Sequence, residues 1–277
     1  MATERIVIEK NVEIQLRDGV RTYADVYRPD VSEPLPAVLT RTTYNKEPIP
    51  GGSPIMPPPL SLAQEGYVVV VADSRGRWSS EGTFETFVDE QNDGYDTIEW
   101  AAGLPWSSGE MGTVGSSYDG WTQMELAHTR PPHLKAMIPQ AIAANLLDRE
   151  MGAVLRLGRV LWWSTVTLSP DQRRRHDATW GPRTIGEAER LWTVQDRVKW
   201  LWHLPLMEIP DDVMFGISPH WRKWLQDHAT DHFGFEAKHA RMEVPALVTT
   251  GWYDQQVGAI KNFTGLAENA ATQKARD

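Results

Sequence analysis

The feature that most constrains the fold is a glycine- and serine-rich stretch between a short predicted strand and a predicted helix. It reads Gly115-Ser-Ser-Tyr-Asp-Gly120, after the short run 111–114 that predicts a strand and before 121–128, which predicts a helix. A serine on such a sharp strand-to-helix turn is typical of a nucleophile elbow, which lifts the hydroxyl above the edge of the sheet. An ordinary loop that begins a helix is the alternative interpretation.

Steric crowding indicates which of the two serines would be the nucleophile. If it is Ser117, then Gly115 lies two residues earlier, where the tight turn tolerates no side chain. If it were the preceding serine, Val114 and Tyr118 would occupy the crowded flanks. The pattern therefore predicts Ser117, in a Gly-x-Ser-x-x-Gly motif where Asp119 occupies the position of the usual second glycine.

The first half of the chain alternates between predicted strands and helices. Residues 5–28 have strand-like alternation around a hairpin turn at Asp18-Gly19. Further predicted strands cover 37–41, 67–72, 111–114 and 134–139, and a helix covers 93–103. Strands rich in β-branched residues suit a buried, mostly parallel sheet, so the fold class is α/β.

The middle of the chain has a different pattern. Eight of the 13 tryptophans lie between 145 and 241, where valine runs disappear and tryptophan and charge recur at helical spacing: Trp162, Trp163, Trp180, Trp192, Trp200, Trp202, Trp221 and Trp224. We expect a helical cap over 145–241, inserted between a core that covers 1–144 and its second part, 242–277. Residues 244–250 are predicted to return to the sheet as a strand.

Composition excludes several classes of protein. A net charge of −9 argues against a nucleic-acid binder, and the longest apolar runs are too short to span a bilayer. The chain has no cysteine, which excludes disulfides and thiol catalysis. Its start has neither a basic segment nor an apolar segment of a secretion signal. These features predict a cytoplasmic protein without membrane or nucleic-acid partners, and they are compatible with a homodimer.

Several blocks occur in the order found in one family of hydrolases. They are Asp25-Val-Tyr-Arg-Pro29, Arg41-Thr-Thr-Tyr-Asn-Lys46, Gly66-Tyr-Val-Val-Val-Val-Ala-Asp-Ser-Arg-Gly76, Ser80-Glu-Gly82, Asp96-Thr-Ile-Glu-Trp100, the 115–120 stretch and Gly251-Trp-Tyr-Asp254. With them the chain resembles the cocaine esterase / X-Pro dipeptidyl-peptidase group of α/β-hydrolases, which also contains α-amino acid ester hydrolases. The middle of the chain matches this group only loosely.

The resemblance implies an α/β-hydrolase core with an inserted helical cap and a serine hydrolase that forms an acyl-enzyme. It makes Ser117 the nucleophile and Asp254 the acid of a triad. Asp254 follows a predicted strand downstream of the serine, the order usual in these folds, although it could be an ordinary turn aspartate. The oxyanion hole would consist of the Tyr44 hydroxyl and the Tyr118 backbone N–H. No metal or organic cofactor is implied, and the expected partner is a small ester or amide.

The triad histidine is missing from its expected place. In the family it follows the acid, yet residues 255–277 contain no histidine. All eight histidines lie upstream: His128, His133, His176, His203, His220, His228, His232 and His239. We therefore expect a truncated hydrolase that lacks the final strand and helix and the C-terminal jelly-roll domain. The alternative base is a histidine of the predicted cap whose side chain reaches the Ser117 hydroxyl.

Weaker features complete the prediction. Asp73 and Arg75 favour a structural ion pair near the site, and the His228/His232 pair favours a solvated helix over a zinc site. Three tryptophans are candidate substrate contacts: Trp162, Trp163 and Trp252.

Two rival functions remain open from the sequence. One is an X-Pro dipeptidyl aminopeptidase or an α-amino acid ester hydrolase, which needs an acidic group for the free amine of its substrate. The other is a catalytically incomplete fragment with only a binding role.

Overall fold

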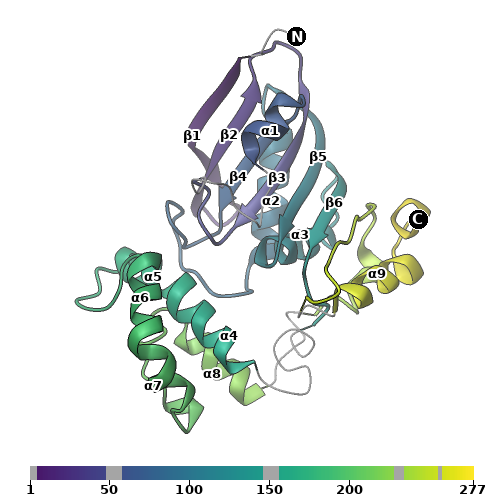
Figure 1. The fold of residues 1–277 in the computed structure, drawn as a ribbon. Helices are drawn as coiled ribbons and strands as arrows, with labels where there is room; N and C mark the ends of the chain where they lie inside the picture. Colours follow the sequence, from purple (N-terminus) through teal and green to yellow (C-terminus); the bar gives the residue numbers. More distant parts are fainter. Residues whose placement is uncertain (1–4, 48–57, 146–155, 228–233, 255–257) are drawn as a thin grey trace.

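The computed structural model describes residues 5–47, 58–145, 156–227, 234–254 and 258–277. Within these residues the centre of the fold is a six-stranded sheet in the order β1-β2-β4-β3-β5-β6 (Figure 1). The strands are β1 (Ile6–Gln15), β2 (Arg21–Pro29), β3 (Leu35–Thr42), β4 (Val68–Asp73), β5 (Ser107–Ser116) and β6 (Leu134–Gln140). The β1–β2 hairpin and the β2–β4 pair are antiparallel, whereas β4, β3, β5 and β6 pair in parallel.

Helices cover both faces of the sheet, as buried parallel strands require. The side chains of β4 alternate between two apolar clusters: Val69 and Val71 pack with Ala63 of α1 (Pro59–Gln64). Val68 and Val70 belong to the main cluster, together with residues of α2 (Glu90–Ala102) and α3 (Tyr118–Ala127). The predicted α/β fold with a mostly parallel sheet is therefore confirmed.

A set of short helices follows β6 and gathers at one end of the sheet (Figure 1). These are α4 (Leu157–Trp162), α5 (Ser169–Arg175), α6 (Ile185–Leu191), α7 (Arg197–Leu201), α8 (Ser218–Asp227), the π-helical turns η2 (Trp163–Leu168) and η3 (Trp192–Asp196), and the 3₁₀ turn η4 (Leu206–Glu208). The buried tryptophans among them pack in the core: Trp163, Trp192, Trp200, Trp221 and Trp224. The predicted boundaries of the cap, at 144/145 and 241/242, stay predictions.

One buried arginine connects these helices to the end of β4. Arg77 is fully buried, and its Nε–H and Nη1–H donate to the carbonyl oxygens of Thr43 and Leu168 at 3.0 and 2.8 Å. Asp171 of α5 pairs with the same guanidinium at 3.4 Å. Because a buried charge is costly unless it is fully hydrogen-bonded, this contact holds the helical region in one position against the sheet.

The segment predicted as a strand over 244–250 joins the sheet only in part. It pairs in parallel with β6 through isolated bridges at Ala246 and Thr249. Met137 N–H donates to Pro245 O at 3.1 Å and Ala141 N–H donates to Thr249 O at 2.8 Å, but Pro139 between them has no N–H, which interrupts a regular ladder. The 3₁₀ turn η5 (His239–Arg241) precedes the 244–250 segment. The 12-residue helix α9 (Gly258–Asn269) and the helix α10 (Gln273–Arg276) follow it. No helix in the described ranges is long and apolar enough to cross a bilayer.

Candidate active site

Ser117 lies on a strained turn between a strand and a helix. β5 ends at Ser116, α3 begins at Tyr118, and the backbone of Ser117 has φ 59° and ψ −124°. The neighbouring strand holds this turn, because Ser117 N–H donates to Gln140 O at 2.9 Å. Non-glycine residues in such a conformation persist only where the surrounding structure imposes it. The predicted elbow geometry is therefore confirmed, and Ser117 is partly exposed at its tip.

Both glycines of the motif are required because neighbouring atoms leave no space for a Cβ at either position. A Cβ added at Gly115 would lie 2.7 Å from Asp119 Cβ, and one added at Gly120 would lie 2.9 Å from Gln140 O. Real Cβ atoms do not approach other atoms this closely without displacing them. Gly115 thus allows the turn to close, and Gly120 allows α3 to pack against the end of β6. The steric choice of register made from the sequence agrees with this geometry.

The side chain of Tyr118 points away from the elbow into the core. Its hydroxyl donates to Glu90 Oε1 at 3.1 Å and accepts from Phe87 N–H at 3.0 Å. Glu90 in turn pairs with buried Arg41 at 2.6 Å. The Tyr118 backbone N–H makes no hydrogen bond with any described residue, and it is the first N–H of α3. First-turn N–H groups have no partner within their helix, so this group is suited to an anion.

Tyr44 follows β3 and contacts the cap through Trp163. The indole Nε1–H of Trp163 donates to the Tyr44 hydroxyl oxygen at 3.2 Å, and Tyr44 N–H donates to Thr42 Oγ1 at 3.0 Å. Since the hydroxyl oxygen accepts this bond, its own proton is directed at a different acceptor. Trp163 is buried and stacks on Phe87 at 5.8 Å, so this donor is rigidly held. The convergence of Tyr44 and Tyr118 on one oxyanion stays a prediction.

Asp254 lies at a turn after the segment that pairs with β6. Its N–H donates to Gly251 O at 2.9 Å, and its Oδ2 accepts from Thr250 Oγ1 at 3.2 Å. The neighbouring Trp252 is 96% exposed, whereas Trp162 is held by a bond from its Nε1–H to Glu189 Oε2. The roles predicted for Asp254, Trp162 and Trp252 stay predictions, because residues 255–257, next to this turn, lie outside the described residues.

Six of the eight histidines lie in the described ranges, and none of them hydrogen-bonds to Ser117. His228 and His232 lie outside those ranges. His220 contacts the aromatic group beside the elbow: its ring lies 5.8 Å from Phe87, which stacks on Tyr118 at 4.9 Å. Among the described residues, no three histidines or carboxylates gather where they could hold a metal ion.

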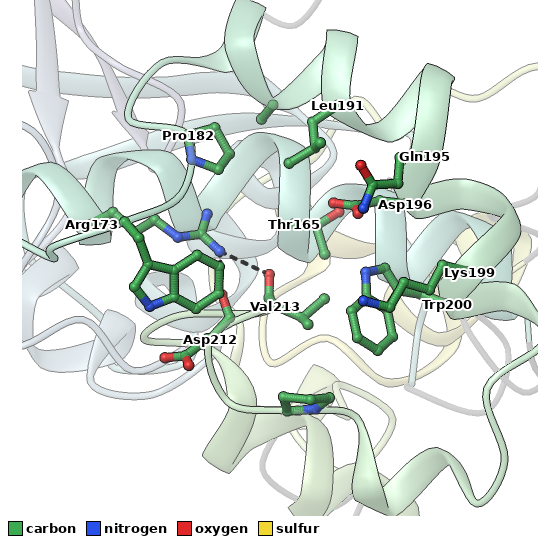
Figure 2. A pocket seen from close by; sticks show the side chains of 13 residues that line it. Thr165, Arg173, Pro182, Leu191, Gln195, Asp196, Lys199, Trp200, Asp212 and Val213 are labelled. Atoms are coloured by element: carbon green, nitrogen blue, oxygen red, sulfur yellow. Dashed lines mark hydrogen bonds between the residues drawn. The ribbon is translucent and has the colours of Figure 1, made fainter.

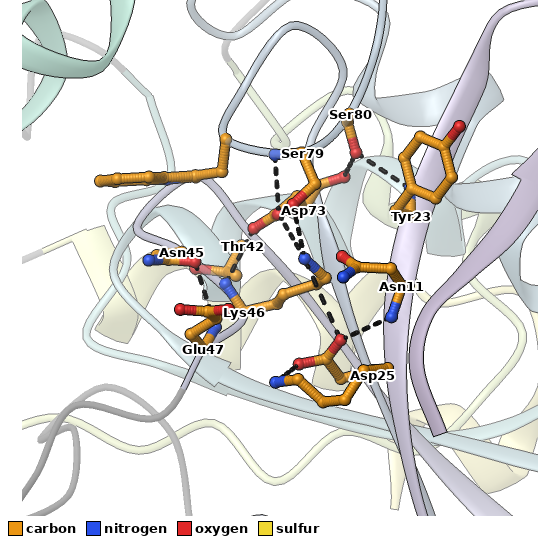
Figure 3. A network of polar contacts seen from close by, with 12 residues as sticks. Asn11, Tyr23, Asp25, Thr42, Asn45, Lys46, Glu47, Asp73, Ser79 and Ser80 are labelled. Carbon is orange, nitrogen blue, oxygen red and sulfur yellow. Dashed lines mark hydrogen bonds and ion pairs between the residues drawn. The ribbon is translucent and has the colours of Figure 1, made fainter. Parts of the chain in front are cut away.

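The predicted ion pair between Asp73 and Arg75 is wrong: Asp73 pairs with Lys46 (Figure 3), and Arg75 has other partners. Asp73 accepts from the backbone N–H and the Nζ of buried Lys46 at 2.8 and 3.2 Å. Arg75 instead pairs with Asp93 of α2 and with Asp18, both at 2.7 Å. Asp73 is the last residue of β4, whereas Arg75 lies beyond it on the following turn, so the two side chains meet different neighbours. The Asp73–Lys46 contact holds the loop that carries Tyr44.

Asp119, in the first turn of α3, is a site residue whose environment sequence reasoning did not predict. It is buried, and burial raises the pKa of its carboxyl well above the usual range, while the Thr42 hydroxyl and the Thr43 N–H oppose the shift. No cation pairs with it among the described residues. Asp119 therefore connects the elbow to the loop of Tyr44 through its bonds with the Thr42 hydroxyl and the Thr43 N–H. The signal in the sequence was that Asp119 occupies the position at which the motif usually has its second glycine.

This environment gives a pH-dependent prediction for Asp119→Asn. A carboxyl whose pKa is raised in the folded state contributes stability at low pH, and this stability is lost as pH rises through the folded pKa. The free energy of unfolding of Asp119→Asn should therefore match the wild type near pH ~4 and increasingly exceed it at higher pH, because an amide does not ionise. Urea unfolding over this range of pH measures the difference. Equal destabilisation by Asp119→Asn at every pH would contradict it.

The sequence of this chain matches the profile of a known protein family. The profile of the X-Pro dipeptidyl-peptidase family (S15) matches residues 18–275. The chain belongs to this family. It is 31% identical to the cocaine esterase of Rhodococcus sp. (strain MB1 Bresler) over 277 residues, which is 95% of this chain and 47% of that protein. The chain thus spans about half the length of this relative. The absence of the last core elements and of the jelly-roll domain stays a prediction.

Solved structures agree on the fold. A CocE/NonD family hydrolase from Staphylococcus aureus matches with a TM-score of 0.63 and 24% identity, over 97% of this chain and 45% of that one. An α-amino acid ester hydrolase matches with a TM-score of 0.67 and 22% identity, over 96% and 46% of the two chains. The resemblance inferred from the sequence blocks is therefore confirmed, and so is the α/β-hydrolase type of fold.

Proposed function

We propose that the protein is a serine hydrolase that cleaves carboxylic esters or amides through an acyl-enzyme. The observation that carries the proposal is the strained elbow at Ser117, which has a φ of 59° and is flanked by Gly115 and Gly120, where no side chain fits. Such strain in a partly exposed serine at the carboxyl edge of a sheet is typical of a nucleophile. Membership of a hydrolase family supports the same reaction.

In this proposal Ser117 Oγ attacks the carbonyl carbon of the substrate, and the carbonyl oxygen gains negative charge. The Tyr118 N–H and the Tyr44 hydroxyl donate to that oxygen, with Tyr44 oriented by the bond from Trp163. A base must take the proton of Ser117 and return it to the leaving group. Because the chain spans 47% of cocaine esterase, we assign this base to a histidine in the part of the fold that the chain does not span, oriented by Asp254.

The alternative within the family is cleavage after an X-Pro dipeptide or of an α-amino acid ester. Those reactions need a carboxylate that binds the free amine of the substrate. In the described part of the chain, Glu90 is paired with Arg41 and Asp73 with Lys46, and Asp119, which has no cation partner, is buried and not exposed to the amine of a substrate. The arrangement therefore favours an ester or amide without a free amine.

A fluorophosphonate probe tests the proposal on a longer form of the protein that includes the downstream coding sequence. The probe reacts with activated serines, so we expect covalent labelling that Ser117→Ala abolishes. Ser116→Ala is the matched control, since it removes the adjacent hydroxyl, and it should still label. Labelling that persists in Ser117→Ala would refute the assignment of the nucleophile. Turnover of p-nitrophenyl acetate in preference to Ala-Pro-p-nitroanilide would separate the esterase from the X-Pro peptidase.

A further inference from the structure

The helical region contains a cavity of its own, separate from the elbow (Figure 2). Its volume is about 270 Å³, close to the lower limit of small-molecule sites. The walls come from η2, α5, α6, η3, α7 and the loops that contain residues 180–182 and 210–213. Most of the lining is apolar or aromatic: Trp180, Pro182, Ala188, Leu191, Trp200, Pro210 and Val213. No residue of the proposed triad or oxyanion hole lines it.

A buried cation that forms no ion pair with any described residue lies at one side of this cavity. Arg173 of α5 is only 3% exposed. Its Nη2–H groups donate to the carbonyl oxygens of Asp212 and, at 3.1 Å, of Val213. Its Nη1 has no hydrogen-bond partner, and no carboxylate forms an ion pair with Arg173 among the described residues. Burial lowers the pKa of this guanidinium, with Asp196 and Asp212 opposing the shift.

The opposite wall is built from unusual backbone. Thr165 belongs to the π-helical turn η2, and Asp196 belongs to the π-helical turn η3. Single π-helical turns are rare and frequently occur at functional sites. In Figure 2 Asp196 lies across the cavity from Arg173, beside Trp200. The Nζ of Lys199 lies 4.3 Å from the centre of the Trp200 ring, which fixes this aromatic wall.

We propose that this cavity binds a small organic carboxylate with a single apolar ring. The carboxylate would lie at Arg173, where it supplies a direct ion pair and an acceptor for Nη1, since a buried charge is costly unless it is paired and hydrogen-bonded. The ring would lie against Trp200 and Leu191, which leaves the ligand's carboxylate on the Arg173 side of the cavity, away from the like charge of Asp196. This second site does not depend on the function proposed for Ser117.

Binding of two matched ligands to the 277-residue chain tests the site. The ¹⁹F NMR signal of 4-fluorophenylacetate should broaden with added protein and saturate, whereas the neutral isostere 4-fluorophenylacetamide should bind at least about tenfold more weakly. The substitution Arg173→Gln should weaken binding of the acid by about tenfold or more and leave binding of the amide unchanged. Equal binding of acid and amide, or no binding of the acid, would overturn the proposal.

Three further variants localise the effect. Arg222→Gln removes another cap arginine that donates to backbone carbonyls, of Met207 and Ile209, and it should bind the acid normally. Ser117→Ala should also bind normally, which separates this site from the elbow. Ala188→Leu fills the cavity while it keeps Arg173, and it should abolish binding. If circular dichroism shows that the Arg173→Gln variant is unfolded, Ala188→Leu decides, and unchanged binding by that variant refutes the site.

Discussion

The 277-residue chain by itself is expected to hydrolyse p-nitrophenyl esters only at a residual rate. No histidine in the described ranges hydrogen-bonds to Ser117, and without a base its hydroxyl stays a weak nucleophile and the leaving group receives no proton. Enzymes that lose a triad member retain about 10³–10⁴-fold acceleration over water, from the oxyanion hole and binding alone. The measurement is ester turnover with and without Ser117→Ala, and we expect the two rates to differ little.

Strong turnover that Ser117→Ala abolishes would contradict this expectation, because a histidine of this chain would then be the base. His220 is the first candidate, since its ring packs against Phe87 beside the elbow. His239 is the matched control: it is buried elsewhere and bonded to Asn262 at 3.1 Å. Loss of activity in His220→Ala but not in His239→Ala would identify a permuted triad.

The second large effect is expected for Tyr44→Phe in a longer, active form of the protein. This change removes the hydroxyl proton that the proposal directs at the oxyanion, and it leaves the ring in place. Loss of one such donor costs about 2.7–4 kcal/mol of transition-state stabilisation, or about 10²–10³ in kcat. Steady-state kinetics on a p-nitrophenyl ester measures it, with KM expected to change much less than kcat.

Tyr118→Phe is the matched control for this experiment. Its hydroxyl is bonded to Glu90 in the core, and the variant keeps the backbone N–H that the proposal uses. It should lose about 1–3 kcal/mol of stability from the unpaired buried partners, with kcat close to that of the wild type. If Tyr118→Phe lowered kcat as much as Tyr44→Phe, or if Tyr44→Phe left kcat unchanged, Tyr44 would be removed from the oxyanion hole.

Local sequence determined the elements of the core and the elbow. β-Branched runs adopt strands because their side chains pack well on a pleated surface, and both runs at 37–41 and 67–72 became parallel strands. The choice of Ser117 over Ser116 rested on the lack of space for a side chain at Gly115, which is a property of the turn itself. Such features depend on neighbours within a few residues, so they could be predicted from the chain alone.

Only the tertiary structure decided which distant groups meet. The partner of Asp73 is Lys46 and not Arg75, because the order of β3 and β4 in the sheet brings the two ends together. The bond from Trp163 to Tyr44, and the cavity beside Arg173, arise where the helical region packs on the sheet and on itself. Ion pairs and cavities depend on the path of the whole chain, and the spacing of residues along the sequence carries no information about that path.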